Sequence, residues 1–178
     1  MAQTHWGSQI VPTDATEKVG YKFFPVQAVS TLGLVANATY AAVTTGSIVA
    51  AQCNATTAAT IVFNADFVPN DLDTSQTCYA AVCYASETTA TTATATFALT
   101  YQNIAAGNTI VAPAVTCGAI ADVTVAATIG VYGETTTVAM STKPTPGNLL
   151  AFKLVCDPLV ADTISILGIK MSYTKRFL

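Results

Sequence analysis

The sequence predicts an all-β protein, built as an antiparallel β-sandwich that follows an extended N-terminal arm. Three observations support this fold class. β-Branched residues occur along the whole 178-residue chain, apolar and polar residues alternate at a period of two, and turn residues interrupt this alternation about every ten residues. No long window repeats apolar residues at the spacing of three and four that marks a helix.

Residues 1–25 are predicted to form the arm, and residues 26–178 the sandwich domain. The arm contains Pro12 and most of the early charges, and its first 20 residues show no sustained alternation. An aromatic residue in such a segment is typical of an anchor in a partner's groove, although Trp6 packing onto its own domain is the alternative. We therefore expect a partner-binding set that consists of His5, Trp6, Ile10, Val11, Tyr21, Phe23 and Phe24.

Strands are expected around residues 21–26 and 32–43, and the clearest alternation comes later in the chain. Residues 86–96, rich in Thr and Ala, fit either a loop or an edge strand. The later apolar faces are Phe97, Leu99 and Tyr101; Val123, Val125, Ala127 and Ile129; and Leu150, Phe152, Leu154 and Cys156. A further strand is expected over residues 78–85, after the turn residues Pro69, Asn70 and Asp71.

The last predicted strand changes phase in its middle. Ile164 and Ile166 lie on one face, and Leu167, Ile169, Met171 and Tyr173 continue the pattern shifted by one residue. Gly168 stands at the change, which predicts a β-bulge there. Short strands with turn residues at these intervals favour a sandwich, and a jelly roll is the form we expect.

Charge is scarce in this sequence. Only 10% of the residues are charged, the net charge is −3, and residues 23–65 and 88–120 contain no charge at all. Either partners cover much of the surface, or Thr and Ala supply a neutral exterior. An acidic chain without a basic cluster argues against nucleic-acid binding, and no uninterrupted apolar window of membrane-spanning length occurs. The first ten residues lack the pattern of a secretory signal.

The five cysteines predict free, buried thiols in a reducing compartment. Their number is odd, no CxxC pair occurs, and Cys78 and Cys83 are spaced to lie on opposite faces of a strand. A single histidine cannot complete a zinc site with them. We expect no metal and no cofactor.

No catalytic arrangement emerges from the remaining polar residues, and we expect no enzymatic activity. His5 has no partner set for a nucleophilic triad, and residues 130–133 lack the helix and Lys of a phosphate-binding loop. Asp66, Asp71 and Asp73 are candidates for a calcium site or a carboxylate pair, but their spacing fits a solvated turn better.

Several segments in order along the chain resemble tailed-bacteriophage virion proteins with jelly-roll folds. The segments are FVPNDLD at residues 67–73, AGN at 106–108, PGNLLAFKL at 146–154, Cys156-Asp157, and DTISILGIKMSY at 162–173. The similarity spans about 110 residues and leaves residues 1–60 uncovered. Asn148 stands where that family usually has Asp, and Cys156 stands where it usually has Arg.

The resemblance implies a capsid decoration (cement) protein that binds the major capsid protein, made in the host cytoplasm and located on the virion capsid surface. A homo-oligomer, dimer or trimer, is the expected assembly. One alternative is a tail, fibre or receptor-binding module that uses exposed aromatics, for which Tyr79, Tyr84, Tyr101 and Tyr132 are the candidates, although their places on alternating strands fit the core or an interface better. A secreted adhesin is the other, disfavoured by the absent signal and the odd cysteine count.

Overall fold

The computed structural model describes residues 3–6, 9–12, 18–26, 34–43, 48–53, 57–89, 93–158 and 163–176; of residues 3–6, 9–12 and 34–36 it describes only the backbone. All the regular secondary structure within these ranges consists of strands. The described ranges contain no helix that is long and apolar enough to span a membrane. The strands are β1 (Gln3–Trp6), β2 (Gln9–Pro12), β3 (Val19–Pro25), β4 (Leu34–Ala36), β5 (Ala38–Ala42), β6 (Val49–Cys53), β7 (Ala59–Val62), β8 (Asp66–Phe67), β9 (Tyr79–Ser86), β10 (Thr94–Ile104), β11 (Val115–Thr116), β12 (Val123–Thr124), β13 (Tyr132–Glu134), β14 (Val138–Ala139), β15 (Leu149–Pro158) and β16 (Ile164–Thr174).

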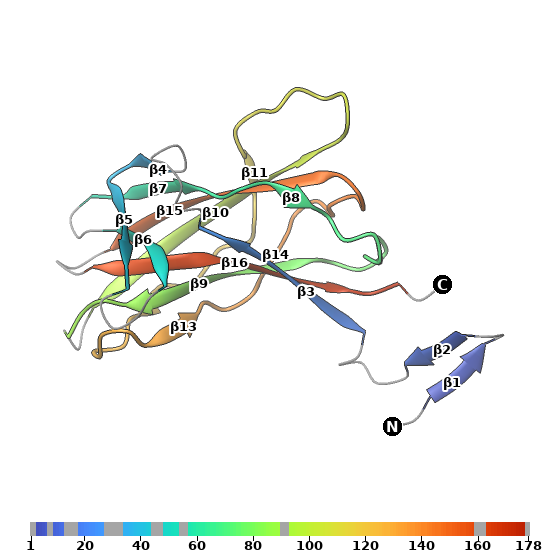
Figure 1. The fold of residues 1–178 in the computed structure, drawn as a ribbon, viewed down its shortest axis with the longest axis horizontal. Coiled ribbons are helices and arrows are strands. Elements are labelled where there is room, and N and C mark those ends of the chain that lie inside the picture. The colour runs from blue at the N-terminus through green and yellow to red at the C-terminus, as the bar shows by residue number, and fades with distance from the viewer. Residues whose placement is uncertain are drawn as a thin grey trace.

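Two antiparallel seven-stranded sheets pack together as a sandwich (Figure 1). One, the β16 sheet, contains β13, β9, β16, β6 and β5 in that order, with β14 on β9 and β3 on β16. The other, the β15 sheet, contains β11, β10, β15, β7 and β4, with β12 on β10 and β8 on β15. The predicted all-β antiparallel sandwich is therefore confirmed. The jelly-roll connection of its strands stays a prediction.

The core lies between the two sheets, and alternation along the long strands fills it. Leu150, Phe152, Leu154 and Cys156 of β15 are fully buried, as the period-two pattern predicts. Phe152 contacts Phe24 of β3 edge to face, with ring centroids 4.9 Å apart. Burying one such side chain stabilises the fold by about 1.5–3 kcal/mol.

The predicted bulge in the last strand is confirmed. The register between β16 and β9 shifts between Ile166 and Gly168. A Cβ on Gly168 would lie 2.6 Å from the carbonyl oxygen of Phe24 and 2.5 Å from Cζ of Phe23. The bulge therefore brings β3 and β16 together at a distance that only glycine allows.

The predicted strand over residues 123–129 is shorter than the alternation suggested. β12 ends at Thr124, and the backbone N–H of Gly130 and the carbonyl of Val131 instead bond to Ser86. These hydrogen bonds hold residues 130 and 131 beside the end of β9, and the following strand, β13, pairs with β9. Similarly, residues 32–43 contain two strands in different sheets, because the chain bends at Asn37, whose φ is +55°.

The N-terminal boundary differs from the predicted one. β1 and β2 pair with each other as a hairpin, with Gln3 opposite Pro12. The strand expected around residues 21–26 is present as β3 (Val19–Pro25), but it pairs with β16 along its whole length, although the predicted arm extended to residue 25. Residues 19–25 are thus part of the sandwich, because Phe24 alternates into the core once β3 joins the sheet.

Candidate interaction face

The outer surface of the β16 sheet collects aromatic side chains from three strands. Strand register places Tyr21 of β3 and Tyr79 of β9 on either side of Ser172 of β16. One row along, Phe23 lies beside Lys170. Because paired residues point to the same side of a sheet, all of these side chains face away from the core.

Tyr132 of β13 pairs with Ala85 of β9 and lies on the same side of the sheet. We call Tyr21, Phe23, Tyr79 and Tyr132 the aromatic face. Their exposed fractions are 64%, 48%, 43% and 55%. Between them β9 presents the small, buried side chains of Ala81, Cys83 and Ala85. Exposed apolar side chains gathered on one sheet mark a surface that a partner can cover.

The charges on this face neutralise each other. Lys170 Nζ lies 2.9 Å from Glu134 Oε2 and 5.1 Å from the centre of the Tyr21 ring. The Tyr132 hydroxyl donates a hydrogen bond to Glu134 Oε1 and also lies 3.4 Å from Cys83 Sγ. The Tyr132 hydrogen bond and then that of Lys170 hold the pKa of Glu134 below its usual value, and Glu134 raises the pKa of Lys170. The face therefore carries no net charge from this pair.

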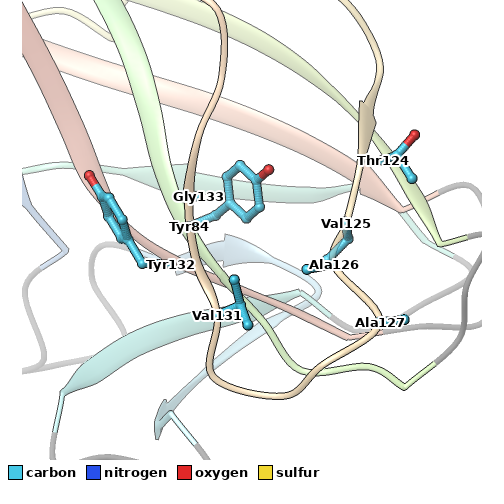
Figure 2. A pocket seen from close by; sticks show the side chains of 8 residues that line it. All are labelled: Tyr84, Thr124, Val125, Ala126, Ala127, Val131, Tyr132 and Gly133. Carbon is cyan, nitrogen blue, oxygen red and sulfur yellow. The ribbon is translucent and has the colours of Figure 1, made fainter.

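A pocket of about 410 Å³ opens beside Tyr132. Figure 2 shows the Tyr84 ring between residues 131–133 and residues 124–127, with the Tyr132 side chain on the other side of its strand. Gly133 makes room for this ring, because a Cβ there would lie 2.5 Å from Cζ of Tyr84. Small or apolar groups and the Thr124 hydroxyl line the rest of the pocket, an environment suited to a small neutral group.

The three carboxylates considered for calcium each serve a separate local contact. Asp66 pairs with Lys22 at 2.7 Å, which lowers the pKa of the carboxyl, and Asp71 accepts a hydrogen bond from the Tyr173 hydroxyl at 3.1 Å. Asp73 accepts hydrogen bonds from the backbone and hydroxyl of Ser75, which lower its pKa. Within the described ranges no three His, Cys, Asp or Glu side chains come together as metal ligands.

The structure separates the predicted partner-binding residues. Tyr21 and Phe23 are exposed on the aromatic face, but Phe24 is only 1% exposed and belongs to the core, so its assignment to a partner surface is corrected. In the hairpin of β1 and β2, the backbone of His5 pairs with that of Ile10, and Val11 pairs with Thr4. The side chains of His5, Trp6, Ile10 and Val11 lie outside the part of the chain that is described.

The aromatic candidates for a receptor-binding module also divide. Tyr84 and Tyr101 are buried, and Tyr79 and Tyr132 are exposed. Sequence reasoning favoured core or interface positions for all four. Alternation alone could not locate the aromatic face, because β3 has aromatic residues on both of its sides, and only the pairing with β16 decides which side is buried.

All five cysteines are free, as predicted. Cys53, Cys78, Cys83 and Cys156 are buried, and Cys117 is partly buried. Burial raises the pKa of Cys78 to about 11 and that of Cys117 to about 12, so both thiols are protonated at neutral pH.

No protein-family model matches this chain, and no curated protein proves similar to it.

Proposed function

We propose that this chain is a non-enzymatic structural protein of a bacteriophage virion, a capsid decoration protein that binds and stabilises the shell. The observation that carries the proposal is the aromatic face: four exposed aromatic side chains on one sheet, whose ionic pair is already neutralised. Resemblance of the later segments to phage virion proteins supplies the identity of the partner, the major capsid protein.

The energetics of such a face favour a protein partner. Tyrosine and other aromatic residues dominate the binding energy of protein interfaces, and each buries about 150–250 Å² when fully covered. Four of them supply several hundred Å², less than the roughly 800 Å² that each side of a stable interface buries. The rest of the contact would come from other surfaces, and the N-terminal hairpin is our candidate.

Low overall charge agrees with this use. Covering Lys170 and Glu134 together costs less than covering either alone, because each retains its partner.

We further propose that several copies of the chain, assembled as dimers or trimers, bind to the surface of each capsid. We also propose the jelly-roll form of the sandwich, which is supported by the alternation of later strands between sheets: β9 and β16 in one, β10 and β15 in the other.

A receptor- or carbohydrate-binding module is the second candidate, favoured by the exposure of Tyr79 and Tyr132. Stacking on a sugar needs aromatic platforms of this kind, together with free polar groups that fix orientation. The only carboxylate of the described aromatic face, Glu134, is engaged with Lys170 and Tyr132, and this argues for the protein partner.

The test uses shells assembled from the major capsid protein of the same viral genome. We expect purified chain to decorate these shells saturably, and the double variant Tyr21→Ser/Phe23→Ser to bind at least about tenfold more weakly. Phe67→Ser is the matched control, since Phe67 is 62% exposed but lies on the β15 sheet. No binding of the wild-type chain would contradict the proposal, and binding of a glycan array instead would favour the second candidate.

Deletion of the hairpin is a separate test of the arm. The deletion must stop at residue 17, because the backbone N–H of Lys175 bonds to the carbonyl of Lys18 and Val19 begins β3. We expect deletion of residues 1–17 to weaken shell binding and to leave the circular dichroism spectrum of the sandwich unchanged. Undiminished decoration by this variant would remove the hairpin from the contact.

A further inference from the structure

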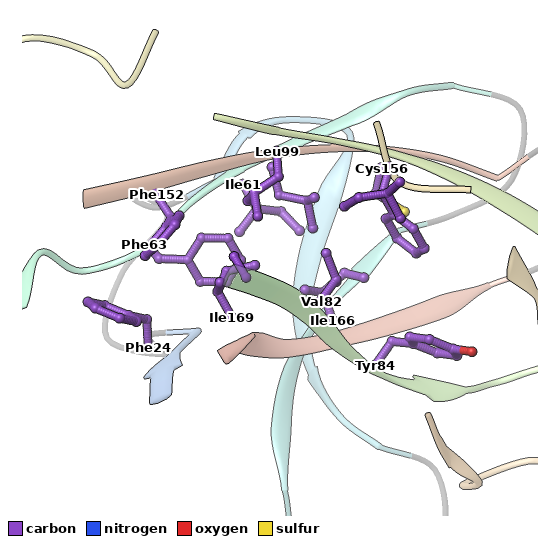
Figure 3. Close-up of a cluster of buried hydrophobic side chains, with 14 of the residues drawn as sticks. Phe24, Ile61, Phe63, Val82, Tyr84, Leu99, Phe152, Cys156, Ile166 and Ile169 are labelled. Carbon is purple, nitrogen blue, oxygen red and sulfur yellow. The ribbon is translucent and has the colours of Figure 1, made fainter. Parts of the chain in front are cut away.

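Two buried thiols lie between the two sheets, on strands that approach each other closely. Cys53 is the last residue of β6 in the β16 sheet, and Cys156 belongs to β15 in the other sheet. Both have no exposed surface, and both belong to the core cluster between the sheets. Figure 3 shows the Cys156 side chain among the buried side chains of that cluster.

Short connections between strands of the two sheets hold the sheets close together near Cys53. β4 and β5 lie in different sheets with only Asn37 between them, and β7 in the β15 sheet begins six residues after β6 ends. Cα atoms of β6 and β15 consequently lie within 8 Å of each other, closer than the roughly 10 Å usual between packed sheets. A disulfide needs Cα atoms about 4.4–6.8 Å apart, and strands that approach within 8 Å come near that range.

Small neighbours make this approach possible. Cys53 is paired with Ala38 of β5, and Cys156 is paired with Ala59 of β7. A hydrogen bond with the Cys53 side chain, together with burial, raises the pKa of the Cys156 thiol far above its usual value. The Cys156 thiol therefore stays protonated and slow to react while the fold is closed.

We propose that Cys53 and Cys156 form a disulfide bond that joins the two sheets when the protein meets a low-molecular-weight disulfide such as oxidised glutathione. One cysteine sulfur attacks the glutathione disulfide and releases one glutathione thiol. The second cysteine sulfur then displaces the other glutathione from the mixed disulfide. Two electrons and two protons pass from the cysteine thiols to glutathione, giving one protein disulfide and two glutathione thiols.

The bond would convert a protein made with free thiols into a cross-linked one. It closes a loop of roughly 100 residues, and long loops gain the most from a cross-link because the unfolded chain loses freedom. The reaction is slow in the folded protein, because both sulfurs must become accessible through transient opening at this corner. Cys78, Cys83 and Cys117 remain free.

The experiment treats the full chain with oxidised glutathione at pH 8 and maps its peptides under non-reducing conditions. We expect one internal cross-link, between the peptides containing Cys53 and Cys156, and a melting temperature raised by roughly 5–10 °C and restored by dithiothreitol. Cys53→Ala and Cys156→Ala should each abolish the rise, and Cys117→Ala should preserve it.

Refolding from denaturant in a glutathione redox buffer removes the protection that burial gives to the thiols. Formation of the same cross-link there supports the proposal even if the folded protein reacts too slowly to follow. Recovery of folded protein with Cys53 and Cys156 both reduced, or linked to other cysteines, would overturn it.

Discussion

At the scale of single residues, Tyr101 shows how a polar group is accommodated in this core. Its ring is 1% exposed and packs toward Phe152, and its hydroxyl both donates to the carbonyl of Thr142 and accepts from the N–H of Thr142, each at 2.6 Å. The segment after β14 is thereby fixed to β10. A buried hydroxyl that satisfies two backbone groups is expensive to remove, because both groups lose their partner.

Tyr101→Phe is therefore expected to lower the free energy of unfolding by about 1–3 kcal/mol, since the Thr142 N–H and C=O are left without this partner. Tyr79→Phe serves as the control, because Tyr79 is exposed on the aromatic face and its loss of a hydroxyl should change stability by less than about 0.5 kcal/mol. Urea denaturation of both variants measures the difference. Equal midpoints would contradict the role given to Tyr101.

Glu134 gives the stability of the protein an acid-sensitive part. Its pKa is lowered in the folded state, so the stabilisation is present above its usual value of 4.5 and disappears as the pH falls through the folded value. Lys170 is shifted the other way, and its contribution is lost only as the pH rises above 10.5 toward its raised pKa. The pair is about one-third exposed, so we expect less than about 1 kcal/mol from it.

The Glu134→Gln variant tests the direction of this pH dependence of stability. Wild type should be slightly more stable than the variant at pH 7, and the gap should be smaller at pH 3, below the usual Glu pKa of 4.5, because the stabilisation is lost as the pH falls through the folded pKa of Glu134. Urea titrations at the two pH values measure the gap. A gap that widens on acidification would contradict the assignment.

At the scale of elements, the close approach of β3 to β16 depends on Gly168. We expect Gly168→Ala to destabilise the protein by about 1–3 kcal/mol, because the new methyl group would meet the backbone oxygen of Phe24 at 2.6 Å, and backbone cannot move aside cheaply. Gly118→Ala is the matched control, since its nearest neighbour is Cβ of Val138 at 3.5 Å. Thermal unfolding of the two variants, compared with wild type, gives the result. If Gly118→Ala lowered the melting temperature and Gly168→Ala left it unchanged, the result would contradict this prediction.

The long strands could be predicted from sequence, and the short ones could not. β15 and β16 bury one full face each, so a period of two and a phase change at Gly168 were enough to find them and the bulge. β12 and β13 are two and three residues long, too short for alternation to define, and hydrogen bonds to Ser86 decide where they lie. β3 was misassigned to the arm because long-range pairing with β16 alone makes it part of the sandwich.

The site followed the same division. Tyr21, Phe23 and Phe24 were grouped as aromatic residues of the predicted arm, and their role in partner binding stays a prediction. Only Tyr21 and Phe23 are exposed, because adjacent residues on a strand point to opposite faces and Phe24 enters the core. Tyr132 joined the face only through the pairing of β13 with β9. The contact of Cys53 with Cys156 lies across the two sheets, and no local pattern in the sequence reports it.

At the scale of the whole molecule, the exposed apolar side chains fall into distinct regions. The aromatic face covers the β16 sheet, and Ile110 and Val111 lie on the loop between β10 and β11 that extends beyond the sandwich (Figure 1). With 10% charged residues, the chain has few ionic groups to solvate these regions. We propose that the aromatic face is the surface that a shell protein covers.

Hydroxyl-radical footprinting of free and shell-bound protein tests this claim most directly. We expect oxidation of Tyr21, Phe23, Tyr79 and Tyr132 to fall several-fold on binding, and oxidation of Phe67 on the opposite sheet to stay the same. Protection of Phe67 with unchanged oxidation of the four aromatic residues would contradict it.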